Sequence, residues 1–322
     1  MSTPAAASPV ITVENLSKEF RLGVRMKRVR AVVGASFAVE RGEIFGFVGP
    51  NGAGKTTTIR TLMGLIRPSS GTCTILGHEV PSRAARLQVG FLPESPYFYD
   101  YLSVRELLDL CGRLFGMDAS TRARRANELI DRVGLRAAAD RPMRKYSKGM
   151  LQRAGLAQAL VNDPEVVVLD EPMSGLDPIG RKEVRDLITE LGAAGKTVFF
   201  STHILPDVES ICDRVAIISL GKVHDVGPVG TLLQAKILGT DVVLEVAEDR
   251  DHEKLVPPGG KARRVGKEVA FVLPSEVDVD AWLRGLDGVR IRQVSPRKES
   301  LEDLYVRLTQ RTAGAGAAEG AP

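Results

Sequence analysis

Short apolar runs alternate with helical segments along the first two thirds of the chain. Unbroken apolar runs at 44–48 and 166–169 are strand-sized, and the chain also offers strands at 10–20, 31–40, 197–201 and 214–219. Helices are predicted at 55–66, at 121–133, and from Ser103 to about Gly116, where Ser103 and Glu106 form a capping-box pattern. Strands without alternation, interleaved with helices, are typical of a parallel sheet covered on both faces. The pattern therefore predicts an α/β fold.

A change of composition near Gly227 and Pro228 marks a domain boundary. Beyond it the pattern predicts strands at 242–246 and 269–273, a Gly/Pro-rich loop at 256–260, and helices at 277–286 and 300–310. We therefore expect a flexible N-terminus at 1–9, a first domain at 10–228 with a helical region at about 92–160, a small α+β domain at 229–311, and a disordered tail at 312–322.

The basic stretch 21–30 alternates apolar and mostly polar residues, which predicts a β-ribbon. It is either a solvated hairpin or a contact with a membrane surface or partner. The whole chain has 44 basic and 40 acidic residues among 322, and this small excess does not indicate a nucleic-acid partner.

The three cysteines, Cys73, Cys111 and Cys212, have neither a pairing pattern nor a metal-ligand spacing, which fits a reducing, cytoplasmic location. The N-terminal residues lack the basic and apolar segments of a signal peptide. No apolar run reaches the roughly 20 residues that a membrane-spanning helix needs. We therefore expect that the protein is not itself a membrane channel.

A glycine-rich loop between the strand at 44–48 and the following helix matches the phosphate-binding pattern GxxxxGK[ST]. It comprises Gly49, Pro50, Asn51, Gly52, Ala53, Gly54, Lys55 and Thr56, and Thr57 follows it. The glycines let successive backbone N–H groups point at phosphate oxygens, next to the positive end of the helix. Lys55 is expected to reach the β- and γ-phosphates, and the Thr56 hydroxyl to bind Mg²⁺. The loop predicts Mg·ATP binding, but alone it does not separate a kinase, a GTPase and a transport ATPase.

Two acidic residues follow the apolar strand at 166–169. Asp170 at the strand end is placed to hold Mg²⁺ through water beside the glycine loop. The adjacent Glu171 can orient the attacking water and accept its proton, so we predict it as the catalytic carboxylate. The alternative is an ordinary strand end that enters an acidic loop.

Three further segments, 146–153, 174–177 and 201–203, follow in a fixed order. Together with the glycine loop and the acidic strand end they resemble the ATP-binding cassette (ABC) family over about 10–227. The resemblance implies a P-loop cassette with a mixed-sheet core and a helical subdomain. It also implies that two cassettes pair head to tail, as a homodimer or heterodimer, with each ATP held between the glycine loop of one chain and segment 146–153 of the other.

The same resemblance assigns roles to single residues. It implies that Ser147 and Gly149 bind the γ-phosphate from the partner chain, and that Asp177 positions the two active sites. It implies that His203 contacts the γ-phosphate and holds the catalytic water, and that Phe20 stacks on adenine. Phe20 is alternatively a core residue.

Two departures from the family pattern are visible. Segment 146–153 corresponds to the family's signature, whose consensus is LSGGQ. Tyr146, Lys148 and Met150 replace three residues of this consensus. The loop at 90–94 carries Glu94 instead of glutamine, which still offers an oxygen near Mg²⁺ but adds a charge. Both variants look like the ABC-2 branch of exporters, whose permeases are separate chains.

The expected function is therefore that of an ATP-hydrolysing motor subunit at the cytoplasmic face of the membrane. Its expected cofactors are ATP and Mg²⁺, and its expected partners are a second cassette and a permease that contacts 92–144. No nucleic acid is expected. The alternative is a cassette ATPase that acts on ribosomes or DNA. Such proteins typically carry two cassettes in one chain, a long coiled coil or zinc-binding cysteines, and the sequence offers none of these.

Overall fold

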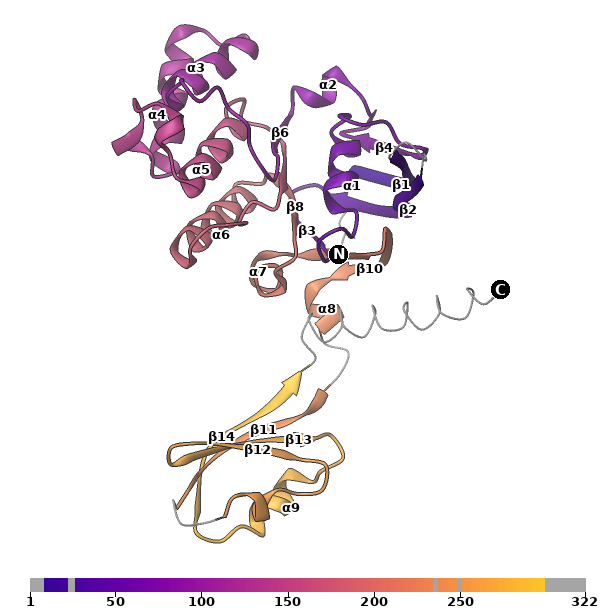
Figure 1. The fold of residues 1–322 in the computed structure, drawn as a ribbon, viewed down its shortest axis with the longest axis vertical. Coiled ribbons are helices and arrows are strands. Elements are labelled where there is room, and N and C mark those ends of the chain that lie inside the picture. Colours follow the sequence, from indigo (N-terminus) through magenta and orange to yellow (C-terminus); the bar gives the residue numbers. More distant parts are fainter. Residues whose placement is uncertain (1–8, 23–26, 234–236, 248–250, 299–322) are drawn as a thin grey trace, which may run out of the picture. The chain divides into compact units, whose positions relative to one another are not determined.

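The structure is a computed structural model, and it describes residues 9–22, 27–233, 237–247 and 251–298. The chain divides into two compact units, Met1–Val229 and Gly230–Pro322 (Figure 1). Pro9, which the sequence assigned to a flexible end, begins the first strand. The rest of that predicted N-terminus, the predicted helix at 300–310 and the predicted tail at 312–322 lie outside the described residues.

A six-stranded sheet forms the centre of the first unit, in the order β10-β9-β3-β8-β7-β6. Its strands are β3 (Ile44–Val48), β6 (Val89–Leu92), β7 (Val166–Asp170), β8 (Thr197–Thr202), β9 (Arg214–Ser219) and β10 (Lys222–Pro228). Every residue of β3, β7 and β8 is buried. The strands pair in parallel except for β10, which is antiparallel to β9. The sheet is therefore mixed, as the cassette resemblance implies.

An antiparallel sheet, β2-β1-β4-β5, packs against this centre. It contains β1 (Pro9–Leu22), β2 (Lys27–Glu40), β4 (Ser70–Ile75) and β5 (His78–Glu79). Phe37 of this sheet stacks on Phe45 and Phe199 of the central sheet, with ring centroids 5.9 and 5.8 Å apart. The described residues of the basic stretch, 21–22 and 27–30, lie on the paired antiparallel strands β1 and β2, as the predicted β-ribbon requires.

The helices of the first unit lie around these sheets and in a separate helical region (Figure 1). They are α1 (Lys55–Leu62), α2 (Arg83–Arg86), α3 (Val104–Leu114), α4 (Ala119–Arg132), η1 (Arg136–Ala138), η2 (Met143–Lys145), α5 (Lys148–Ala159), α6 (Pro178–Ala193) and α7 (Leu205–Ile211). The predicted capping box of Ser103 and Glu106 is confirmed. Helix α1 is shorter than predicted, because Gly64 turns left-handed at a φ of 67° shortly after its end.

The second unit is a four-stranded antiparallel sheet with a short helix. Helix α8 (Val229–Leu233) begins at the last residue of the first unit. The other elements are β11 (Ile237–Val246), η3 (Glu253–Leu255), β12 (Lys261–Val265), β13 (Glu268–Pro274), α9 (Val279–Arg284) and β14 (Val289–Lys298), and the strand order is β12-β13-β11-β14. Its core contains Val242, Leu244 and Phe271, with Trp282 of α9 packed edge-on against Phe271. Within the described residues no helix is long and apolar enough to cross a membrane.

Candidate functional site

The glycine loop connects β3 to α1 and depends on two close backbone approaches. A side chain at Gly49 would overlap the carbonyl oxygen of Ile218, and one at Gly54 would overlap that of Ala31. Gly54 also has a φ of 108°, which L side chains rarely adopt. The glycines at these positions are therefore required by packing and backbone conformation.

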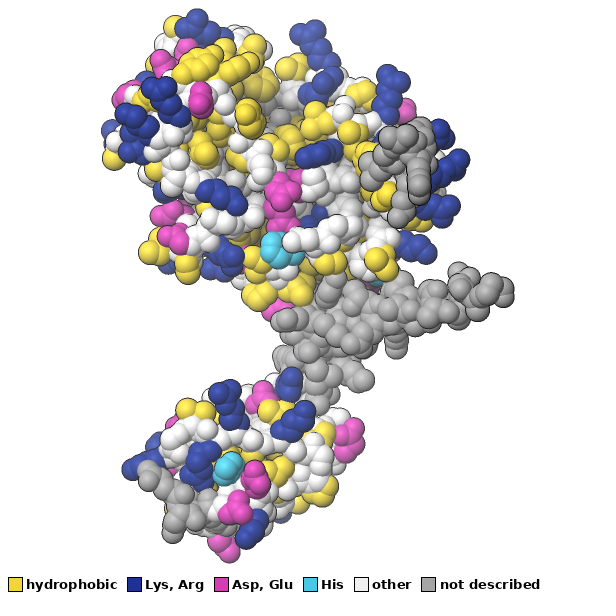
Figure 2. All heavy atoms as spheres, in the orientation of Figure 1, with side chains coloured by type: hydrophobic (Ala, Val, Ile, Leu, Met, Phe, Trp, Pro, Cys, Tyr) yellow, Lys and Arg dark blue, Asp and Glu magenta, His cyan; other side chains and the backbone are white. Residues whose placement is uncertain are grey.

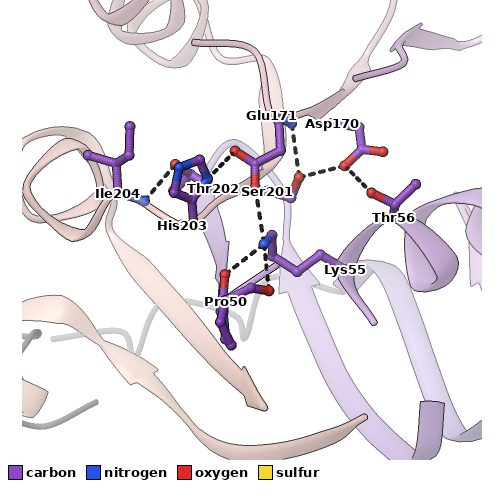
Figure 3. Close-up of polar contacts among 10 residues, drawn as sticks. Pro50, Lys55, Thr56, Asp170, Glu171, Ser201, Thr202, His203 and Ile204 are labelled. Carbon is purple, nitrogen blue, oxygen red and sulfur yellow. Dashed lines mark hydrogen bonds and ion pairs between the residues drawn. The ribbon is translucent and has the colours of Figure 1, made fainter. Parts of the chain in front are cut away.

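Lys55 is the first residue of α1 and its side chain is buried. Its Nζ donates hydrogen bonds to the carbonyl oxygens of Gly49 and Pro50, at 2.6 and 3.1 Å. The same Nζ lies 3.0 Å from Glu171 Oε1 (Figure 3). The lysine thus links the glycine loop to the end of β7.

Asp170, the last residue of β7, is fixed by two hydroxyl groups. Ser201 Oγ donates to Asp170 Oδ1 at 2.7 Å, and Thr56 Oγ1 donates to the same oxygen at 3.2 Å. Burial raises the pKa of this carboxyl above its usual value. The two hydrogen bonds lower the pKa, whereas the charges of Glu94 and Glu171 raise it further. Ionisation of Asp170 is therefore unfavourable in the protein when no cation is bound.

Glu171 adopts a left-handed backbone, with a φ of 50°, and its side chain is buried. Its N–H donates to Ser201 Oγ at 3.0 Å, and its Oε2 lies 2.8 Å from Nδ1 of His203. Because Oε1 faces Lys55, the carboxylate is held between two basic side chains (Figure 3). His203 follows β8 and is partly exposed, so this carboxylate connects the buried loop to the surface.

We call the cavity above the glycine loop the phosphate pocket. It is lined by Ala31, Pro50, Asn51, Gly52, Gly54, Lys55, Thr56, Thr57, Glu94 and Glu171. Acidic side chains gather near the middle of the visible face of the larger unit, next to a histidine and bordered by basic side chains (Figure 2). The pocket thus combines the predicted loop residues, except Gly49 and Ala53, with the two glutamates.

Three predicted site residues lie elsewhere, in a second cavity that we call the signature cleft. Ser147, Gly149 and Asp177 line it, and it shares no lining residue with the phosphate pocket. Ser147 caps α5 by accepting a hydrogen bond from the N–H of Met150, and Asp177 caps α6 by accepting one from the N–H of Gly180. Within one chain, the structure does not bring these residues to the phosphate pocket.

Phe20 does not line the phosphate pocket either. It is half-buried on β1 opposite Val29, and Lys18 Nζ lies 5.0 Å from the centre of its ring. Its stacking on adenine stays a prediction. Sequence reasoning missed Ala31 and gave no role to Ser201, which bridges the two carboxylate residues. The adjacent parallel strands β7 and β8 pair Asp170 with Ser201, and no pattern in the sequence indicates this register.

Comparisons with known proteins agree with this architecture. Residues 32–174 match the model of the ABC transporter family. The chain is 43% identical to an ABC transporter ATP-binding protein of Synechocystis, over 95% of this chain and 88% of that protein. It is 37% identical to the Nod factor export ATP-binding protein I of Burkholderia lata, over 94% of this chain and 98% of the relative.

A solved structure of an ATP-binding subunit of an ABC transporter superposes with a TM-score of 0.62 at 30% identity. The match covers 69% of this chain and 91% of that one. The predicted cassette fold is thereby confirmed. The chain therefore belongs to the ATP-binding cassette family, as an ATP-binding subunit of an ABC transporter.

Proposed function

We propose that this chain hydrolyses Mg·ATP as one half of a cassette dimer and drives export through a separate membrane permease. The observation that carries the proposal is the buried carboxylate of Glu171, held between Lys55 and His203 beside the glycine loop. A carboxylate fixed at this place is suited to accept the proton of an attacking water. Family membership and the glycine loop indicate that the bound nucleotide is ATP.

Lys55 is the residue that connects ATP binding to Glu171. In the structure its Nζ is held by two loop carbonyls and by Glu171 Oε1. Phosphate groups in the pocket would compete for this cation. When Lys55 turns to them, Glu171 Oε1 becomes available to the attacking water, while His203 keeps Oε2 in place. Hydrolysis would therefore begin only after the phosphates are bound.

The residues around Asp170 fit a magnesium ion. Hydroxyl and carboxylate oxygens are the ligands that Mg²⁺ prefers, and Thr56 and Asp170 lie within hydrogen-bonding distance of each other. Burial raises the pKa of Asp170, and the nearby carboxylates of Glu94 and Glu171 raise it further. A bound cation would neutralise the negative charge of this group of acids. Thr56, Asp170 and Glu94 would hold the ion directly or through water. The ion would withdraw charge from the phosphate oxygens.

The separation of the two cavities supports a dimer. Ser147, Gly149 and Asp177 line the signature cleft and not the phosphate pocket of the same chain. A head-to-tail pair would place the signature cleft of one cassette against the phosphate pocket of the other. Each site would then be complete only in the presence of a partner.

An exposed aromatic surface supports the permease contact. Tyr97, Tyr99 and Tyr101 follow the loop that carries Glu94, and their side chains are largely exposed, Tyr97 completely. They line a cleft together with Met143 and Leu151. Apolar surface of this kind marks an interaction site. Export is supported by the similarity to the Nod factor export ATP-binding protein I. We propose that the chain works at the cytoplasmic face of the membrane, where the permease would bind it.

Glu171→Gln tests the mechanism. The amide cannot accept the proton, so turnover should fall by about 10²–10⁴-fold while ATP remains bound. The trapped ATP should hold two cassettes together, which sedimentation with ATP measures against the same protein with ADP. A monomer that retains full hydrolysis would contradict the proposal.

Purification of the tagged wild-type protein from detergent-solubilised membranes tests the transport role. With ATP, a protein with several membrane spans should co-elute. The matched control replaces the exposed Tyr97 by Ser, which should weaken the co-elution without changing ATP hydrolysis in the absence of the membrane protein. Recovery of ribosomal proteins or DNA in place of a membrane protein would refute the transport role.

A further inference from the structure

Thr202 is the last residue of β8 and is only 2% exposed. Its hydroxyl accepts a hydrogen bond from the N–H of Ile204 at 3.0 Å (Figure 3). Its carbonyl oxygen accepts one from the N–H of Gly49 at 3.3 Å. His203 lies in the turn that the first of these bonds closes. Thr202 therefore connects the first residue of the glycine loop to the turn that carries His203.

The imidazole of His203 has little other support. The described residues give its ring one hydrogen-bond partner, Oε2 of Glu171 at 2.8 Å, and its side chain is 41% exposed. Helix α7 begins at Leu205, and Ile204 before it provides no side-chain cap. The direction of the imidazole therefore depends on the backbone of the turn. A threonine hydroxyl that accepts the N–H two residues further on holds such a turn in place.

The contacts of Thr202 belong to a closed ring of polar contacts around the phosphate pocket. Lys55 Nζ donates to the carbonyl oxygen of Gly49, and the N–H of Gly49 donates to Thr202. Thr202 holds the turn of His203, and His203 contacts Glu171. Oε1 of Glu171 in turn faces Lys55. When phosphates draw the lysine away, the direct contact with Glu171 opens. The bonds of Thr202 do not involve the lysine side chain, so they remain.

We propose that Thr202 is a positioning residue: its two hydrogen bonds keep the imidazole of His203 on Glu171 while ATP is bound. This inference rests on the proposed function, in which Glu171 accepts the proton of the attacking water. Without the hydroxyl, the turn loosens and the imidazole leaves Oε2. The carboxylate then loses its second basic partner after Lys55 has already turned to the phosphates. Thr202 does not line the phosphate pocket, so it affects turnover and not the binding of ATP.

Thr202→Val tests the proposal, because valine keeps the branched shape of threonine and removes the hydroxyl. The kcat of ATP hydrolysis should fall by about five- to tenfold, as expected for the loss of one hydrogen bond, while KM stays constant. Thr202→Ser keeps a hydroxyl and should recover most of the rate. In a His203→Ala background, Thr202→Val should cause no further loss, because Thr202 acts through the histidine. Single-turnover measurements at saturating ATP detect the slow rates of this pair.

Thr197→Val is the matched control from the same strand. Thr197 is the first residue of β8, is fully buried, and its hydroxyl accepts the N–H of Gly42 at 2.9 Å. Each substitution therefore removes a buried hydroxyl that holds a turn, at opposite ends of one strand. Thermal unfolding should show a similar loss of stability in both variants. Only Thr202→Val should lower kcat, because Thr197 lies at the end of β8 away from His203.

Two results would overturn the positioning role and leave the proposed function intact. One is a wild-type kcat in Thr202→Val. The other is the same fractional loss of rate with His203 present and with His203→Ala, which would make Thr202 a structural residue that does not act through the histidine. A wild-type kcat in Glu171→Gln would instead refute the catalytic carboxylate, and the role of Thr202 with it.

Discussion

The phosphate pocket and the signature cleft are built in opposite ways. In the phosphate pocket, Lys55, Asp170 and Glu171 are buried and joined through Ser201 and the loop carbonyls. In the signature cleft, Ser147 and Asp177 are exposed and bond only to the first turns of their own helices. One region is preorganised by the central sheet before any ligand arrives. The other presents groups whose use depends on a second molecule.

The largest difference between the regions should appear in Lys55→Ala. This change removes the cation that links Gly49, Pro50 and Glu171 and would face the phosphates. ATP should bind about 100-fold more weakly to the monomer, as expected for the loss of strong charged hydrogen bonds. Nucleotide titration measures this affinity.

Ser147→Ala provides the contrast from the signature cleft. It should leave the monomer's affinity for ATP unaltered and weaken only the ATP-dependent dimer, because Ser147 does not line the phosphate pocket. Equal losses of monomer affinity in both variants would show that the two regions do not work separately.

A smaller effect is expected from Ser201→Ala. The hydroxyl of Ser201 donates to Asp170 and accepts the N–H of Glu171, so its loss misplaces both carboxylates. Turnover should fall about tenfold or more, in the range that residues supporting a metal site show, with little change in ATP affinity. Ser201→Thr keeps a hydroxyl and should recover most of the rate. Wild-type turnover of Ser201→Ala would mean that the sheet alone fixes the pocket.

The smallest effect concerns stability. Burial holds the pKa of Asp170 above its usual value, so the folded protein binds this proton more tightly than the unfolded chain does. The protonated group therefore contributes to stability at low pH, and this contribution is lost as the pH rises through the pKa of the folded protein. At neutral pH the ionised group lowers the free energy of unfolding. Asp170→Asn should therefore raise the free energy of unfolding of the protein without Mg²⁺ at pH 7. It should also weaken Mg·ATP binding.

Thermal unfolding in the presence of a chelator measures the Asp170→Asn effect, and the gain should shrink as the pH falls toward 4. Asp177→Asn is the matched change in the signature cleft. Asp177 is exposed and Asn caps a helix as well as Asp does, so its unfolding temperature should stay nearly constant. A similar gain in both variants would attribute the effect to net charge and not to burial.

The sequence predicted the buried parallel strands best. Runs such as Val166–Leu169 contain no polar residue and are therefore recognisable as buried strands, and the residues that follow them define the site. Strands β4, β12 and β14 were missed because polar or charged residues interrupt their apolar pattern. Strand β6 has only four residues.

Contacts between distant segments were beyond a single sequence. Nothing near Ser201 indicates that its hydroxyl meets Asp170, since this depends on the pairing of β7 with β8. The signature cleft and the phosphate pocket of one chain share no lining residue, and the family resemblance, rather than any local pattern, had implied this separation. Local patterns thus revealed the chemical groups, and the sheet register decides which of them touch.

The left-handed residue at the end of β7 also determines how two neighbouring acids share their surroundings. Asp170 turns to Thr56 and Ser201, while Glu171 turns to Lys55 and His203 (Figure 3). A single-residue insertion before Asp170 would move this residue into the place of Glu171, so that the acid suited to a metal would face Lys55. A shift of one residue along the backbone would therefore disturb both acids at once, whereas a substitution changes one of them. The backbone geometry at Asp170 and Glu171 thus decides which acid faces Thr56 and which faces Lys55.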